Sequence, residues 1–224
     1  MKFKKLLWAS LGMLLTIGVL NSCTHDDDLI TPGGTADLKR GTDVIDMAGG
    51  WTFDKSHSSV IWETAYMGTA ALLSGRFNMF GMTSMKFDEA NPANTSFEGW
   101  VRLNTVNTGE PGRDGGCLLG TFGTNATNVD QPENIAKLKS TSVTLSTTDK
   151  GYIVLADLTF HGVTKQVTVK LDYNGTAEFT GTTPYKLGGL TAQFQFNAKS
   201  DFGIASNNIA DKVSVKINCN FKKS

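Results

Sequence analysis

The chain has 224 residues, of which 40% are hydrophobic, and its 21 basic residues balance 21 acidic ones. Residues 1–22 hold three lysines and no acidic residue, so without them 18 basic and 21 acidic residues remain, a net charge of −3. No basic field is present to hold a nucleic acid, and that class of partner is excluded. The length suits one domain with a substantial core, plus a tail.

The first 23 residues have the pattern of a bacterial lipoprotein signal. Three lysines in residues 2–5 precede an apolar run from Leu6 to Leu20, which suits a signal-peptide core and is short for a membrane span. Leu20 stands three residues before Cys23, as in a lipoprotein cleavage site. We therefore predict a signal peptide over residues 1–22 and lipidation of Cys23 by diacylglycerol, with palmitate as a typical acyl chain. Such an anchor holds the protein to a membrane without spanning it. An ordinary secretory signal is the alternative.

The residues that follow Cys23 predict where the protein resides. Residues 24–28 (THDDD) resemble the acidic export tag of surface lipoproteins in some Gram-negative groups. We predict an outer-membrane lipoprotein, and both the cell surface and the periplasmic face stay open. Residues 23–48 lack periodicity, and the TPGG stretch at residues 31–34 breaks any helix. This range is predicted to be a flexible tether.

From residue 49 to residue 224, apolar and polar residues alternate in several stretches. Period-two alternation predicts half-buried antiparallel strands. The clearest stretches are residues 60–64, 97–104, 152–160, 163–173, 190–197 and 213–221. Closing such strands into a barrel removes exposed sheet edges, whereas a two-sheet sandwich is the alternative.

Turn residues divide these stretches. His161-Gly162 predicts a hairpin over residues 152–173, and Asn174-Gly175 is expected to end its second strand. The Gly-rich stretch from residue 109 to about residue 135 interrupts the alternation, and a short helix is predicted near residues 114–119.

Five motifs, in order from Trp51 to the C-terminus, resemble those of the YceI-like family of lipocalin-like, polyisoprenoid-binding proteins. They are DKSHS from Asp54, GRFNMFG from Gly75, RD from Arg113, ADLTFHGVTKQV from Ala156 and SDFG from Ser200. The resemblance implies an all-β fold: a lipocalin-like, eight-stranded antiparallel β-barrel with one or two short helices in its loops.

The resemblance also implies a long apolar channel that holds a polyisoprenoid, such as a quinone tail. The strand alternation fits this independently, because an eight-stranded barrel can enclose one small ligand. Burying a tail yields about 0.8 kcal/mol per CH₂ before ordering costs. The side chains expected to line the channel are Phe77, Phe80, Phe97, Val101, Leu158, Phe160, Val167, Phe194 and Phe196.

Four polar residues are expected at the rim of the channel: His57, Tyr66, Arg113 and Asp114. Tyr66 stands where the family often has a second histidine. Gly116 replaces the histidine of the family's R-D-x-H-L motif, so the head group of the ligand stays open. Arg113 and Asp114 form a polar gate that meets the head group of the ligand, or else a local salt bridge or a helix N-cap by Asp114.

No catalytic motif or metal-ligand spacing is present, and His25 lies in the tether. We predict a non-enzymatic protein without a cofactor, apart from a bound isoprenoid or quinone-like lipid, that carries, stores or sequesters its ligand. One rival is an envelope interaction or structural lipoprotein with a packed barrel core, and another is an enzyme using His57 or Arg113-Asp114.

Cys117 and Cys219 are either a disulfide or two small buried hydrophobic residues. A homodimer through an outer barrel face also stays open.

Overall fold

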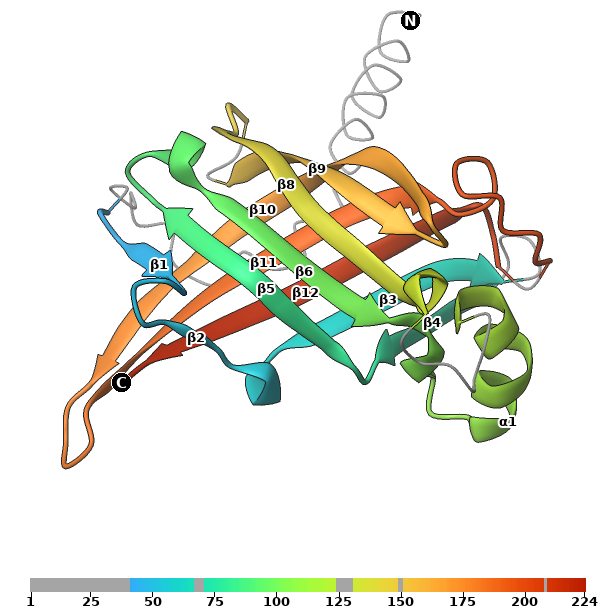
Figure 1. Cartoon of the computed structure of the whole chain (residues 1–224), viewed down its shortest axis with the longest axis horizontal. Coiled ribbons are helices and arrows are strands. Elements are labelled where there is room, and N and C mark those ends of the chain that lie inside the picture. Colours follow the sequence, from blue (N-terminus) through green and yellow to red (C-terminus); the bar gives the residue numbers. More distant parts are fainter. Residues whose placement is uncertain (1–40, 67–70, 124–130, 149–150, 208) are drawn as a thin grey trace, which may run out of the picture. The chain divides into compact units, whose positions relative to one another are not determined.

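The computed structural model describes residues 41–66, 71–123, 131–148, 151–207 and 209–224 (Figure 1). The predicted signal peptide, Cys23, His25 and most of the predicted tether lie outside the described residues. Within the part of the chain that is described, no helix is long and apolar enough to cross a membrane.

The described residues contain twelve strands in one sheet. Three are short: β1 (Val44–Asp46), β2 (Thr52–Phe53) and β7 (Val106–Asn107). The longer strands are β3 (Ser59–Tyr66), β4 (Ala71–Phe77), β5 (Phe80–Asp88), β6 (Ser96–Arg102), β8 (Ile135–Leu145), β9 (Tyr152–Phe160), β10 (Val163–Phe179), β11 (Tyr185–Asn197) and β12 (Lys212–Lys223). The predicted all-β, lipocalin-like antiparallel barrel is confirmed. The sheet has four more strands than the eight expected, and three of its strands are only two or three residues long, which is too few to show alternation.

Every ladder of the sheet is antiparallel, and the strands follow the order β1-β5-β6-β8-β9-β10-β11-β12-β3-β4-β7, with β2 on β12. Figure 1 shows β5, β6 and β8 crossing in front of β10, β11 and β12 as the sheet curls. No ladder joins β4 to β5 among the described residues. The chain passes between these two strands after β6: it turns through η3 (Leu103–Thr105) and then pairs as β7 with β4.

The predicted hairpin around His161-Gly162 is confirmed. Strands β9 and β10 pair from Phe160 opposite Val163 onward. His161 and Gly162 have φ values of 50° and 75°, the left-handed pair that a two-residue hairpin turn requires. However, β10 does not end at Asn174-Gly175. Its pairing with β11 shifts register there and continues to Phe179, so the predicted strand end is instead a bulge with Gly175 at φ 101°.

The folded unit begins earlier than residue 49. Strand β1 lies inside the range predicted as tether, and it pairs with β5 through Ile45 opposite Phe87. Both of these side chains are fully buried. Tyr173 on β10 donates a hydrogen bond to Asp43 Oδ2 at 2.6 Å, so the segment carrying β1 bridges β5 and β10. The tether prediction is wrong from about residue 43 onward, because one buried isoleucine in three residues gives no detectable period.

The predicted short helix is present and is longer than expected. A single turn, α1 (Pro111–Arg113), runs into the π-helical segment η4 (Asp114–Gly123). Leu118 and Phe122 are the η4 side chains that are almost fully buried in the barrel core. The remaining helical turns are η1 (Lys55–His57), η2 (Pro92–Asn94) and η5 (Pro132–Asn134).

Cys117 and Cys219 are both free. Cys117 is exposed on η4, whereas Cys219 lies on the inward face of β12. Burial raises the pKa of the Cys219 thiol to about 12, so the thiol stays protonated at neutral pH. The expected alternatives were a disulfide or two small buried hydrophobic residues. Cys219 fits the second, because it is partly buried against the core, whereas the exposed Cys117 fits neither.

Candidate ligand-binding site

The inward faces of the strands enclose a cavity of about 110 Å³. Its lining is almost entirely apolar and comes from both halves of the curled sheet, including β5, β6 and β8 of one half and β11 and β12 of the other. A water molecule occupies about 30 Å³, and pockets for small molecules range from about 300 to 1,000 Å³. The cavity therefore accepts part of an apolar chain as it stands, and a longer chain needs lining side chains to move.

Eight of the nine side chains predicted to line the channel do line this cavity. They are Phe77, Phe80, Phe97, Val101, Leu158, Phe160, Phe194 and Phe196. Val167 does not, although it is buried on β10 opposite Ala156. On the same strand the cavity is lined by Leu171, four residues further on. Alternation identifies the inward face of a strand, but it does not show at which level along the strand the interior leaves space.

Several lining residues were not predicted, among them Phe53, Trp62, Met82, Phe122 and Cys219. Trp62 and Cys219 share the alternating inward faces of their strands, so the pattern could have identified them. Phe122 could not be found in this way, because it lies in the Gly-rich stretch where alternation stops.

Segment η4 covers one end of the cavity. The ring of Phe122 lies 5.0 Å from that of Trp62 and 6.1 Å from that of Phe77, and it faces Phe160 at 6.4 Å. Thr121 Oγ1 hydrogen-bonds to Ser206 Oγ at 3.2 Å, which links η4 to the loop before β12. This end is therefore closed by an aromatic side chain from a segment outside the sheet.

The opposite end is closed by β1 and its neighbours. The ring of Phe87 packs against Tyr152 at 5.4 Å and against Tyr173 at 4.6 Å. Burial is the main cause that raises the pKa of the Tyr173 hydroxyl, and the hydrogen bond to Asp43 raises it further. This group therefore remains a neutral donor.

Arg113 and Asp114 lie outside the cavity lining, and they converge on one residue, Thr108. The Asp114 carboxylate accepts from the Thr108 hydroxyl at 2.6 Å and from its main-chain N–H at 3.0 Å. Arg113 Nε donates to the same hydroxyl at 2.9 Å. These contacts fix the loop that leads into η4. The role of the pair is thus local, but it takes neither expected form: the described contacts include no ion pair between the two residues, and the N-cap of α1 is Glu110, whereas Asp114 is its C-cap.

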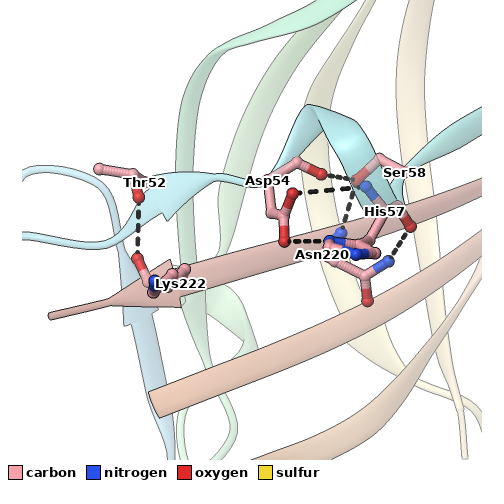
Figure 2. A network of polar contacts seen from close by, with 6 residues as sticks. All are labelled: Thr52, Asp54, His57, Ser58, Asn220 and Lys222. Carbon is pink, nitrogen blue, oxygen red and sulfur yellow. Dashed lines mark hydrogen bonds and ion pairs between the residues drawn. The ribbon is translucent and has the colours of Figure 1, made fainter. Parts of the chain in front are cut away.

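His57 belongs to a polar network that joins η1 to β12 (Figure 2). Its Nδ1 lies 2.7 Å from Asp54 Oδ2, and this hydrogen bond is the main cause of the lowered pKa of Asp54. The Ser58 hydroxyl donates to the Asp54 carbonyl at 2.7 Å and accepts from Asn220 N at 2.9 Å. His57 therefore pairs with a carboxylate and not with the serine hydroxyl, and the network ties the start of β3 to β12.

Tyr66 is 40% exposed at the end of β3. None of the four residues predicted at the rim is in the cavity lining, and no described contact brings them together. Among the described residues, no group of three or more His, Cys, Asp or Glu side chains is placed to hold a metal ion. The site offers an apolar interior with few polar groups, which is an arrangement suited to binding an apolar molecule.

A curled antiparallel sheet with an apolar interior and covered ends places the protein in the lipocalin-like class of binding folds. The comparisons with known proteins agree. The YceI-like domain model matches residues 51–221. A UPF0312 protein of Pseudomonas fluorescens is 34% identical over 178 residues, covering 76% of this chain and 83% of that protein.

Two solved structures share the fold. BcnA of Burkholderia cenocepacia superimposes with a TM-score of 0.60 at 18% identity, over 75% of this chain and 99% of that one. A polyisoprenoid binding domain from Saccharophagus degradans, implicated in plant cell wall breakdown, gives a TM-score of 0.51 at 16% identity, over 78% and 99% of the two chains. The chain belongs to the YceI-like family.

Proposed function

We propose that this protein is an envelope lipoprotein that binds a polyisoprenoid or a similar long apolar ligand inside its barrel, for carriage, storage or sequestration. The observation that carries the proposal is the cavity, because its wall is apolar from the η4 end to the side of Phe53 and Phe80. A binding role for the Saccharophagus domain of similar fold supports it. The protein acts without catalysis: its ligand is held by apolar burial and released unchanged.

The size of the cavity defines what binding requires. Several isoprene units exceed about 110 Å³, so the ligand must displace lining side chains. Met82 and Met85 are lining residues with unbranched, adaptable side chains, and Phe122 is carried by a segment outside the sheet. Each CH₂ buried contributes about 0.8 kcal/mol, which offsets the cost of this rearrangement as the tail lengthens.

The same small volume also favours a second candidate, a non-enzymatic interaction or structural lipoprotein whose barrel core is packed. The two candidates differ in one measurable property, uptake of a long apolar molecule. Either candidate permits a homodimer through an outer face of the barrel.

Substitution of one lining residue tests the binding proposal. Phe194→Arg puts an unpaired charge into the apolar interior, and we expect it to abolish uptake of a fluorescent polyisoprenoid in a titration. The matched control is Gln195→Arg, because Gln195 is the next residue on β11 and is exposed on the outer face. Circular dichroism shows whether each variant is folded. A folded Phe194→Arg protein that still takes up the probe contradicts a site in the barrel.

Substitution of Cys23 tests the anchor. If Cys23 carries diacylglycerol, Cys23→Ser removes the attachment point and releases the protein from membranes into the soluble fraction. Cys117→Ser is the matched control and leaves the protein in the membrane fraction. Retention of the Cys23→Ser protein on membranes would refute the lipoprotein assignment. Protease treatment of intact cells separates the cell surface from the periplasmic face.

A further inference from the structure

The indole of Trp62 occupies a particular place in the cavity wall. Trp62 lies on β3, between Gly75 of β4 and Val215 of β12, and it is only 1% exposed. A Cβ atom at Gly75 would lie 2.8 Å from Trp62 Cζ2 and 3.0 Å from Thr108 Cγ2. The missing side chain of Gly75 thus gives the indole space against β4, next to the loop that Arg113 and Asp114 hold.

The N–H group of this indole is the unusual feature. Nε1 is buried and has no hydrogen-bond partner among the described residues. Buried indole N–H groups normally find an acceptor, because an unpaired donor in an apolar interior loses the hydrogen bond it made to water. The neighbouring ring of Phe122, at 5.0 Å, provides no oxygen atom. One unpaired donor therefore belongs to a side chain of the cavity wall, and that wall is otherwise almost entirely apolar.

We propose that Trp62 Nε1–H donates a hydrogen bond to an uncharged oxygen at the polar end of the ligand, such as a ketone, quinone or ester carbonyl. This inference rests on the proposed binding function and narrows its ligand class. A charged phosphate does not fit this position, because the ring that contacts the indole is Phe122, which in turn contacts Phe77 and Phe160, and none of these rings provides a counter-charge. The site thus distinguishes ligands by a single acceptor, in addition to their length.

The placement of Phe122 indicates how the acceptor reaches the N–H. Nε1 is covered by other atoms, so a ligand oxygen must displace one of its neighbours. Phe122 is the aromatic neighbour that η4 contributes, and its ring is tilted by 53° to the indole. The polar end of the ligand therefore lies beneath η4, and the tail extends toward Phe53 and Phe80.

The test compares two probes that differ only in the acceptor: farnesylacetone, an isoprenoid ketone, and the hydrocarbon of the same carbon skeleton. Both are titrated by native mass spectrometry into the full chain with Cys23→Ser in every sample, so that no lipid is attached there. Trp62→Phe removes the N–H and keeps a ring. Trp51→Phe is the matched control, because Trp51 is also buried but does not line the cavity.

The quantity to compare is the ratio of ketone affinity to hydrocarbon affinity, because the smaller phenylalanine ring also changes the cavity volume. We expect Trp62→Phe to lower this ratio about tenfold and Trp51→Phe to leave it unchanged. An unchanged ratio in Trp62→Phe, or stronger binding of farnesyl phosphate than of the ketone, overturns the inference while the binding function stands. If the chain with an intact Trp62 binds none of the probes, the proposed function itself fails and the inference fails with it.

Discussion

Three glycines of the barrel wall each give space to one large neighbouring side chain. Gly75 lies against Trp62, Gly81 against Trp100, and Gly188 of β11 against Ile45 of β1. A Cβ atom at these positions would come within 2.8, 2.7 and 2.6 Å, respectively, of those side chains. Small residues at these points decide where the indoles lie and allow β1 to approach β11.

Gly75→Ala is expected to destabilise the protein by about 1–3 kcal/mol, the usual cost of overpacking a core. The reason is that its Cβ would also lie 2.8 Å from the main-chain oxygen of Asn107, which cannot move aside as a side chain can. The free energy of unfolding in urea measures the effect. Gly99→Ala is the control, since its nearest neighbour would be at an ordinary 3.5 Å. Equal stability of the two variants would contradict the close packing at Gly75.

At the scale of elements, η4 is the segment that covers one end of the cavity with Phe122. Its start is fixed by the contacts of Arg113 and Asp114 with Thr108. Near its other end, Thr121 bonds to Ser206, and the His161 ring packs against Phe160, whose ring also faces Phe122 of η4. The turn of the β9–β10 hairpin therefore lies close to η4.

This contact predicts a pH dependence. Burial lowers the pKa of His161 below its usual 6.5, and bonds to the main chain of Phe122 and Thr121 and the charge of Glu133 oppose the shift only partly. Below pH 6.5 the unfolded chain binds the proton more readily than the folded one, so His161 makes stability fall as the pH falls.

His161→Asn is expected to weaken that dependence, because asparagine tolerates the left-handed backbone of this turn and does not titrate. The measurement is the melting temperature between pH 7.5 and pH 5 by circular dichroism. The fall in melting temperature over this range should be smaller in the variant. His57→Asn is the control, because its side chain is exposed on η1. A His161→Asn variant that loses as much stability on acidification as the unaltered protein would contradict the account.

At the scale of the whole domain, the fold is a curled sheet whose two ends are closed differently. Strand β1 closes one end through the hydrogen bond of Tyr173 to Asp43 and the packing of Ile45. Segment η4 closes the other with Phe122. Because β1 is tied into a ladder with β5 and η4 is tied by a few local bonds, the η4 end is the one through which we expect a ligand to enter.

The alternation of apolar residues predicts most of this architecture. It identifies the inward faces of β6 and of β9 to β12, and eight of the nine expected lining residues follow from those faces and from the motifs. It fails where too few residues alternate, as in β1, and where a bulge replaces a turn, as at Gly175. Features that depend on contacts between residues distant in sequence cannot be derived from the alternation within one strand. The packing of Phe122 of η4 against Trp62 and Phe160 is an example.

The family motifs predict the fold better than the rim. His57 in η1 and Tyr66 at the end of β3 are placed apart from each other and from Arg113 and Asp114, which lie where α1 runs into η4 and meet at Thr108. The motifs identify these residues as polar. A shared site also requires that their side chains lie close together in space, and a sequence motif does not show this. Trp62 lies in an alternating stretch, which indicates the face of the strand on which it lies but not that its N–H is unpaired among the described residues.

The measurement that tests the central claim most directly is native mass spectrometry of the Cys23→Ser chain, produced in a host that makes quinones and prenyl phosphates. The account predicts a bound mass that matches an uncharged isoprenoid lipid. This mass should be absent from Phe194→Arg and present in Gln195→Arg. A protein that carries no bound lipid and also does not bind added isoprenoid lipid would contradict ligand binding inside the barrel. That result would favour a packed barrel with an interaction role.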